Sequence, residues 1–440
     1  MSATSTPPPY GQTIACECGK THNIDPRIVV YSADAIGRIP ALAGRFGRGM
    51  RVAVLMDART EKVAGREICA TLAGSGREIV EVRVADPAPG ESPVCDSETF
   101  AGVKEQCADA GLILPVGSGV LSDLGKWCAC ELDIPYICFA TAASMNGYSS
   151  ANVAAAVKGV KTVVRAMPPK AVLSSPSVIC NAPSEMTVSG LGDVLAKSVS
   201  SADWRINHVM FGDYYCARAN SLIAAIEPLV MDHPGRLRDH QSDAMEALFE
   251  ALLLTGAAMT MAETSAPASG GEHLISHALD MMSMVDGSAH GMHGAQVGVG
   301  TILASELYRR IMALEHPVLR KTLLNVDRAF WGELGGEVEN QYVQKTARLE
   351  QARELIGRQD MWNRIREEAR VFLRAPEVIQ RCLREAGGAY RAEHIGCTRD
   401  RLRRALLHAH EIRSRFTVLD LAYLTGVLPD AAGEVVEEWA

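Results

Sequence analysis

The first part of the chain alternates short apolar runs with segments of helical periodicity, and this alternation constrains the fold more than any other feature. Apolar runs of this kind are typical of parallel strands buried on both faces, and the helices between them cover the sheet. The pattern therefore predicts a doubly wound α/β domain. The expected strands are Ile28–Tyr31, Val52–Met56, Ile79–Val84, Leu112–Val116, Tyr136–Phe139 and Val172–Ile179, and the expected helices are Ala64–Ala73, Phe100–Ala110 and Leu121–Leu132.

The character of the sequence changes after Pro183, and nearly everything beyond it has helical periodicity with few β-branched runs. Because 440 residues exceed the size of one hydrophobic core, we expect two domains. These are a dinucleotide-binding α/β domain, residues 16–183, and a helical metal- and substrate-binding domain, residues 184–440. Residues 1–15 are rich in Pro, Ser and Thr, which predicts a flexible N-terminus. The expected later helices are Asp193–Arg205, Asp239–Met261, Ile302–Glu315, Lys345–Ile356 and Arg401–Arg415.

The overall charge and the cysteine content exclude several classes of protein. A net charge of -8 offers no basic field for nucleic acid, so an anionic substrate needs a local site. The start of the chain lacks the apolar segment of a secretory signal, and no run is long enough to span a membrane. We expect a cytoplasmic protein whose twelve cysteines are reduced. Cys16, Cys18 and His22 resemble half of a zinc site, but no second pair follows at zinc-ribbon spacing, so structural zinc is not predicted.

A glycine-containing turn follows the strand expected at Leu112–Val116. Gly117, Ser118 and Gly119 lead from that strand into a helix, which brings free backbone N–H groups and the helix dipole to one point, as a pyrophosphate requires. The turn matches neither a P-loop nor a GxGxxG fingerprint, so an ordinary tight turn explains it equally well. Asp57 follows the strand Val52–Met56 and could accept hydrogen bonds from a ribose diol, or could cap a helix.

Histidines cluster in one short segment of the second half of the chain. His273 and His277 are four residues apart and therefore share a helix face, and His290 and His293 follow closely. Two imidazoles and one carboxylate, with open positions, are typical of a catalytic metal site for zinc, nickel or iron. The candidate carboxylate is Asp193, expected at the start of a helix after two glycines, where an isolated Asp would more often be an N-cap.

Ordered segments along nearly the whole chain resemble the sn-glycerol-1-phosphate dehydrogenase family, within the iron-containing alcohol dehydrogenase and glycerol dehydrogenase superfamily. The segments that carry the resemblance are CECGKTHNIDPRIVV, VGSGVLSDLGKWCACELDIPYICFATAASMNGYSSANV, NAPSEMTVSGLGDVLAKSVSSADWRINHVMFGDYYC, SGGEHLISHALD, HGAQVGVGT and EIRSRFTVLDLAYLTGVL. The resemblance implies the dehydroquinate synthase-like fold, a Rossmann-like α/β domain followed by an all-α domain. It also implies metal-dependent reduction of dihydroxyacetone phosphate to sn-glycerol 1-phosphate with NADH or NADPH.

The resemblance also assigns residues to the site. One divalent metal ion, zinc, nickel or iron, would be held by Asp193, His273 and His293, while His277 would contact the substrate or relay a proton. The cofactor-binding residues it implies are Asp57, Gly117, Ser118, Gly119, Asp123, Thr141 and Ser144, and Asp57 would favour NADH over NADPH. The substrate residues it implies are Asn146, Ser150 and His277. Because a phosphate group needs cationic or N–H donors, Lys197, Lys161 and Lys158 are further candidates for a substrate contact. Related enzymes associate, so we expect a homo-oligomer.

The chain departs from the family pattern at three places around the substrate. Asn146 stands where the family has an Asp, Ser175 replaces a strand-end Asp, and Ala295 replaces a Glu. Asn keeps the shape of Asp but carries no charge. Three alternatives therefore stay open: a reductase for a different small carbonyl or polyol, a lyase related to dehydroquinate synthase, and an inactive homologue that binds nucleotide and metal.

Overall fold

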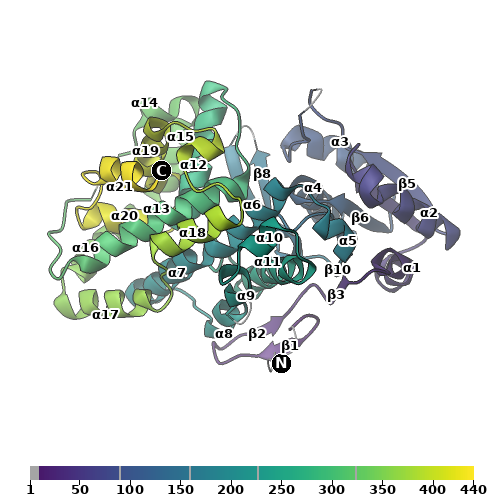
Figure 1. The fold of residues 1–440 in the computed structure, drawn as a ribbon, viewed down its shortest axis with the longest axis horizontal. Helices are drawn as coiled ribbons and strands as arrows, with labels where there is room; N and C mark the ends of the chain where they lie inside the picture. The colour runs from purple at the N-terminus through teal and green to yellow at the C-terminus, as the bar shows by residue number, and fades with distance from the viewer. Residues whose placement is uncertain (1–8, 89–90, 158–159, 225–226, 323–324) are drawn as a thin grey trace. The chain divides into compact units, whose positions relative to one another are not determined.

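The computed structural model describes residues 9–88, 91–157, 160–224, 227–322 and 325–440, which divide into two compact units (Figure 1). The first unit contains residues 1–190 and 217–264, and the second contains residues 191–216 and 265–440. The sequence predicted a domain boundary at residue 183, with all later helices in one domain. The structure differs, because α11 (Ser242–Ala262) packs on the α/β unit: Ser149 Oγ donates to the Leu253 carbonyl at 2.5 Å.

The first unit is built on a six-stranded sheet in the order β3-β10-β7-β6-β4-β5, and every neighbouring pair is parallel. This confirms the predicted α/β class. The elements of the unit in chain order are β1 (Thr13–Ala15), β2 (Thr21–Asn23), β3 (Ile28–Tyr31), α1 (Ala35–Phe46), β4 (Arg51–Met56), η1 (Glu61–Gly65), α2 (Arg66–Gly74), β5 (Glu78–Arg83), α3 (Ser97–Cys107), β6 (Leu112–Gly117), α4 (Gly119–Glu131), β7 (Ile137–Ala140), η2 (Asn146–Ser149), β8 (Asn152–Val157), β9 (Val160–Arg165), β10 (Ala171–Ser174), α5 (Pro176–Cys180), the start of α6 (Ser184–Leu195), α8 (Ala217–Ser221), α9 (Glu227–Met231), α10 (Gly235–Arg238) and α11.

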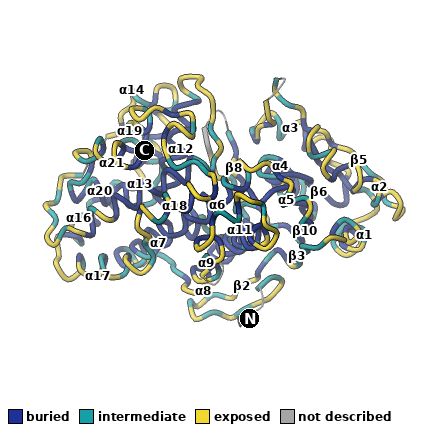
Figure 2. Tube along the Cα trace, in the orientation of Figure 1, coloured by how far each residue is buried: buried dark blue, intermediate teal, exposed yellow. Residues whose placement is uncertain are grey.

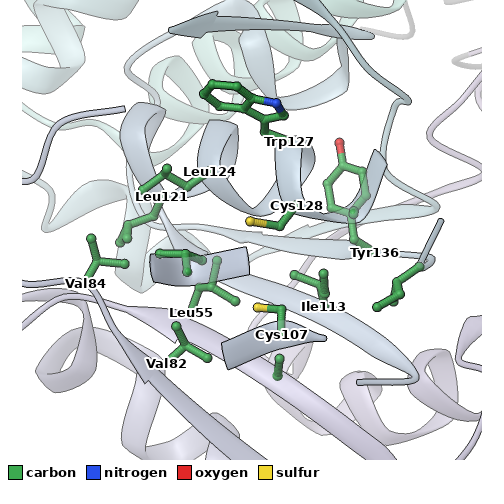
Figure 3. Packing of buried hydrophobic residues seen from close by; sticks show 14 of the residues in the cluster. Leu55, Val82, Val84, Cys107, Ile113, Leu121, Leu124, Trp127, Cys128 and Tyr136 are labelled. Atoms are coloured by element: carbon green, nitrogen blue, oxygen red, sulfur yellow. The ribbon is translucent and has the colours of Figure 1, made fainter. Parts of the chain in front are cut away.

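Strand β4 shows why the sheet needs cover on both faces. Its residues alternate between two apolar clusters: Ala53 and Leu55 pack with α3 and α4, whereas Val52 and Val54 pack with α1 and α2. Figure 3 shows the first cluster, in which Leu55 lies with Val82, Ile113 and Trp127. The apolar runs that predicted the strands therefore reflect burial on two sides.

Strands β4 and β6 are neighbours whose onward connections leave in opposite directions, to β5 on one side and to β7 on the other. Doubly wound sheets bind ligands beyond the carboxyl ends of the strands at such a reversal. Asp57 follows β4, and Gly117 ends β6. The topology therefore brings two of the predicted cofactor positions to the same edge of the sheet.

The second unit is helical. Its two central helices, α12 and α13, pack against each other and are buried over most of their length (Figure 2). Its elements are the end of α6, α7 (Lys197–Phe211), α12 (Gly271–Asp286), α13 (His293–Ala313), α14 (Arg328–Trp331), η3 (Gly332–Leu334), α15 (Gly335–Val343), α16 (Thr346–Ile356), α17 (Gln359–Arg370), α18 (Pro376–Glu385), η4 (Ala392–Ile395), α19 (Arg399–His408), η5 (Ala409–Ile412), α20 (Val418–Leu424) and α21 (Ala432–Trp439).

Some expected boundaries were wrong. The strand expected at Val172–Ile179 ends at Ser174, because Ser175 caps a helix that Pro176 begins. The helix expected at Asp193–Arg205 is interrupted at Ala196, between α6 and α7.

The flexible N-terminus expected at residues 1–15 falls partly outside the described residues, and Thr13–Ala15 forms strand β1, which pairs with β2. Among the described residues, α11 alone is long and apolar enough to span a membrane. However, 83% of its most apolar window is buried, as in the core helix of a globular unit.

The packing of the first cluster predicts the effect of a large-to-small substitution. Leu55 is fully buried and pairs in register with Val82, so Leu55→Ala leaves a cavity in the sheet core. We expect a loss of about 2–5 kcal/mol in stability, seen as a lower melting temperature by circular dichroism. Val63→Ala is the control, since Val63 is 51% exposed and its truncation should change stability by less than about 0.5 kcal/mol. Equal effects of the two substitutions would contradict this packing.

Candidate active site

Three helices of the second unit bring one carboxylate and two imidazoles together. Asp193 lies in the last turn of α6, His273 lies in the first turn of α12, and His293 is the first residue of α13. Their ligand atoms all lie within 4.8 Å of one another, and His293 Nε2 is 3.9 Å from Asp193 Oδ1. Asp193 and His273 are buried, whereas the side chain of His293 is 37% exposed, so the small site on which these polar groups converge is open to solvent beside His293.

Asp193 was expected at the start of a helix, and this expectation was wrong. The glycines before it lie within α6, where Gly192 allows close packing instead of a turn. A Cβ atom on Gly192 would overlap the carbonyl oxygen of Gly294 in α13. The absence of a side chain at this point lets α6 lie directly against the start of α13 and brings Asp193 to His293.

Neighbouring polar groups fix the orientation of the two imidazoles. His273 Nδ1 is 2.8 Å from Glu272 Oε1, and because the carboxylate accepts, Nδ1 carries the proton and Nε2 keeps its lone pair. His293 Nδ1 is 3.4 Å from Ser276 Oγ, and Ser276 donates to Gln296 Oε1 at 2.9 Å. Ligand histidines in metal sites are held by such bonds from the second ring nitrogen. Two imidazoles and a carboxylate suit zinc, nickel or ferrous iron.

His277 lies beside this cluster without belonging to it. Its ring centroid is 5.8 Å from that of His293 and 6.1 Å from that of His273. Arg413 Nη2 donates to His277 Nδ1 at 3.1 Å, and because a guanidinium only donates, the ring proton of neutral His277 lies on Nε2. Burial and the charge of Arg415 lower the pKa of Arg413 to about 10, so Arg413 remains a cation near neutral pH.

A buried carboxylate anchors the helix that carries His273. Asp203 of α7 accepts hydrogen bonds from Gly271 N and Val418 N, both at 2.8 Å, and from the hydroxyl of Tyr308. It therefore holds the first turns of α12 and α20 at once. Burial, and then the charge of Glu272, raise the pKa of Asp203 to about 8. Glu272 Oε2 is buried without a hydrogen-bond partner in the described structure.

The predicted cofactor turn lies in the first unit. Gly117 ends β6, Ser118 precedes α4, and Gly119 begins the helix. A Cβ on Gly117 would collide with Leu121, whereas the space around Gly119 is open apart from a distant contact with Met145. The first N–H groups of α4 have no helical partner and can bind an anion. Ser118 Oγ and Ser144 Oγ are 2.5 Å apart, and Thr141 N donates to the Gly117 carbonyl, so the structure brings these predicted residues together.

Asp57 is already engaged within the chain. Its Oδ1 accepts from the backbone N–H groups of Arg59 and Thr60, and its Oδ2 accepts from the Arg59 guanidinium at 2.8 Å. Burial alone would raise the pKa of Asp57, but these hydrogen bonds outweigh it, and the pKa lies below its usual value. Arg59 also contacts Asp86 at 2.6 Å. A cation therefore lies directly at the position expected for the ribose, which the sequence analysis did not foresee.

Asp123 faces inward. Its Oδ1 accepts from the fully buried Lys126 at 3.0 Å, and its Oδ2 accepts from Ala154 N at 2.9 Å. Lys126 also donates to the carbonyls of Gly147 and Asn152, both at 2.7 Å. These contacts tie the segment that contains Asn146 to helix α4.

The other predicted substrate residues fall in both units. Asn146 begins η2 in the first unit, where the hydroxyl of Ser150 bonds to the carbonyls of its own loop, at 3.2 Å. Lys197 begins α7 in the second unit and is buried, with its Nζ 3.4 Å from Ser201 Oγ. Lys161 lies in β9, and Lys158 lies outside the described residues.

Three residues that contact or support the predicted metal cluster and its neighbour were not among the predicted site residues: Asp203, Glu272 and Arg413. Glu272 directly precedes His273, and that adjacency was the available signal. Asp203 and Arg413 lie far from the histidines in the sequence, and no local pattern connects them.

Comparison with known proteins gives several similar sequences. The family model for iron-containing alcohol dehydrogenases matches residues 30–183. Glycerol-1-phosphate dehydrogenase [NAD(P)+] of Geobacillus stearothermophilus is 30% identical over 407 residues, which cover 92% of this chain and 94% of that protein. The protein of the same name from Thermococcus kodakarensis is 33% identical over 283 residues, covering 64% of this chain and 78% of the relative.

Solved structures share the fold at lower identity. A probable glycerol dehydrogenase from Sinorhizobium meliloti has a TM-score of 0.59 and 18% identity, with 92% of this chain and 97% of that chain covered. Maleylacetate reductase from Agrobacterium tumefaciens has a TM-score of 0.60 and 14% identity, with 94% and 95% covered. These structures support the predicted fold class, an α/β domain followed by a largely helical region.

The three-residue cluster predicts the metal content of variants. His273→Ala removes one ligand, so we expect the purified protein to lose one equivalent of metal, measured by inductively coupled plasma mass spectrometry. Glu272→Gln weakens the bond to Nδ1 and should lower metal affinity by about 10- to 100-fold. His277→Ala is the matched control on the same helix and should keep the full metal content. Full metal content in His273→Ala would exclude this ligand set.

The buried Asp203 predicts a pH dependence of stability. Its pKa rises from 3.8 in the unfolded chain to about 8 in the folded one, so between these values the folded chain holds a proton that the unfolded chain releases. The contribution of Asp203 to the free energy of unfolding is therefore fully present below pH 3.8 and is lost as the pH rises through about 8. Asp203→Asn cannot titrate and should show a flatter melting profile between about pH 5 and pH 9. Parallel profiles for the two proteins would refute the assignment.

Proposed function

The chain belongs to the glycerol-1-phosphate dehydrogenase family of the iron-containing alcohol dehydrogenases, and we propose that it reduces dihydroxyacetone phosphate to sn-glycerol 1-phosphate with NADH or NADPH. The convergence of Asp193, His273 and His293 in the second unit carries this proposal. The donor set fits a divalent cation, because the second ring nitrogen of His273 is already bonded to Glu272. A bound ion would act as a Lewis acid toward the substrate carbonyl.

His277 is the proposed hydrogen-bond donor to the substrate. The bond from Arg413 to Nδ1 leaves the ring proton on Nε2, and from there it can stabilise the oxygen that gains charge during hydride transfer. The proton that this oxygen takes up comes from water, because an imidazole that gave up its only ring proton would be left as an anion. Asp203 and Glu272 act indirectly, by holding the start of α12 and the ring of His273.

Arg413 supports a phosphorylated substrate. The side chain is partly buried, and no carboxylate pairs with its guanidinium in the described parts of the chain. A cation withdrawn from water without a counter-charge is costly, and an anionic ligand would reduce that cost. Guanidinium groups bind phosphate through two parallel hydrogen bonds. We propose that the substrate phosphate binds Arg413, in addition to the lysine candidates of the sequence analysis.

The coenzyme would bind at the first unit, where the first N–H groups of α4 would receive its pyrophosphate. A nicotinamide coenzyme supplies the hydride. Arg59 beside Asp57 supplies a cation for a 2′-phosphate, so we propose that both coenzymes are accepted, in place of the expected preference for NADH. We also propose a cytoplasmic enzyme that forms a homo-oligomer.

The proposal is tested by following NADH and NADPH absorbance with dihydroxyacetone phosphate and with unphosphorylated dihydroxyacetone. We expect turnover of the phosphorylated substrate and a much lower kcat/KM for the other. Turnover of another carbonyl compound alone would favour a diverged reductase, for which Asn146 is the supporting observation. Binding of coenzyme without turnover of any carbonyl would exclude an enzyme.

Arg413→Met sharpens this test because the two substrates differ only in the phosphate. Losing the phosphate contact should lower the preference for the phosphorylated substrate by at least about 30-fold, which corresponds to about 2 kcal/mol. The ratio of the two kcat/KM values is the readout, since any effect on His277 is shared by both substrates. Arg413→Lys keeps the charge and should restore part of the preference. An unchanged ratio in Arg413→Met would refute the phosphate contact.

A further inference from the structure

The β1–β2 ribbon near the N-terminus places three metal-binding side chains together. In its antiparallel register Ile14 lies opposite His22, and Ala15 lies opposite Thr21. Side chains alternate between faces, so Cys16, two residues beyond Ile14, shares a face with His22. Cys18 lies in the turn between the strands, and its Sγ is 3.2 Å from His22 Nε2.

The turn itself is tightly defined. Cys16 N donates to the Lys20 carbonyl at 2.9 Å, and Gly19 N donates to the Cys16 carbonyl at 3.0 Å. Gly19 has φ +86°, a left-handed conformation that a residue with a side chain rarely adopts. The backbone therefore folds back directly after Cys18 and directs both cysteines of the turn toward the strand that carries His22.

The donors lie close enough together for one ion to reach all three of them. The Sγ atoms of Cys16 and Cys18 and a ring nitrogen of His22 all lie within 4.8 Å of one another. With Zn–S near 2.3 Å and Zn–N near 2.0 Å, ligand atoms of such a site lie about 3.5–3.8 Å apart. His22 is only 3% exposed, and the cysteines are partly buried and form no disulfide. Two thiolates and an imidazole select zinc over magnesium or calcium.

The ribbon also needs the support that an ion would give. Each strand has three residues, and an isolated two-stranded hairpin is at best marginally stable. The ion pair between Lys20 and Glu263 joins side chains that are 40% and 57% exposed, and exposed pairs contribute little. A bound ion would therefore add stability that so short a ribbon lacks.

We propose that Cys16, Cys18 and His22 bind a structural zinc ion, separate from the cluster of Asp193, His273 and His293. Binding releases the two thiol protons, and His22 binds as the neutral imidazole, so the site carries no net charge from its protein ligands and the ion together. One further position of the tetrahedron remains for a fourth ligand. The ion cross-links the turn to β2 and stabilises the ribbon without taking part in hydride transfer.

The metal content of variants separates the two sites. We expect Cys18→Ser to lose one equivalent of zinc from the purified full-length protein and to retain turnover. The double variant Cys18→Ser/His273→Ala should lose two equivalents relative to wild type. Cys130→Ser is the matched control, because Cys130 has similar exposure and lies away from the ribbon. Wild-type zinc content in Cys18→Ser would overturn the proposal.

A measurement on the unmodified protein avoids any effect of substitution on folding. Iodoacetamide should label Cys16 and Cys18 slowly in the protein as purified and rapidly after zinc is removed by a chelator, with peptide mass spectrometry as the readout. Added zinc should restore the protection. Labelling that is equally fast with and without chelator would overturn the proposal, whatever the variants show.

Discussion

The predicted metal cluster depends on one contact between two helices that have no side chains at the point of contact. Gly192 of α6 lies against the carbonyl of Gly294 at the start of α13, and any Cβ there would force the helices apart. Asp193 and His293 are the next residue of one helix and the preceding residue of the other. The distance between a carboxylate and an imidazole is thus set by backbone packing, which is stiffer than any arrangement of side chains.

Much of the secondary structure of the first unit could be predicted, because a strand buried on both faces appears in the sequence as a short apolar run. The apolar runs gave β3, β4, β6 and β7 nearly to the residue, and the order of the strands then places Asp57 and Gly117 at one edge of the sheet. The histidines were found from chemistry and spacing. The resemblance to a family was needed to choose His293 over His277 as the third ligand.

Other features could not be predicted because they depend on contacts between distant residues. Helix α11 is apolar over most of its surface, and nothing in such a segment shows which core it enters. Asp123 has the right position for a cofactor contact, but its direction is decided by Lys126 and by a strand thirty-one residues later. The partly buried cation Arg413 is not marked by any local sequence pattern. Zinc at the ribbon is not predicted from the sequence, because no second Cys pair follows at zinc-ribbon spacing, whereas the hairpin register brings the donors together.

The ion pair at the end of β4 would change the physical basis on which the protein selects between the two coenzymes. Both carboxylate oxygens of Asp57 accept hydrogen bonds from the chain itself, and the guanidinium of Arg59 also pairs with Asp86. With the adenosine ribose at this position, a hydroxyl must compete with Arg59 for Asp57, whereas a 2′-phosphate must draw Arg59 away from two carboxylates. Selection between the two coenzymes then depends on which groups bind the Arg59 guanidinium. Competitions of this kind are screened by dissolved ions, so the balance between the two redox pools that feed the enzyme would shift with ionic strength.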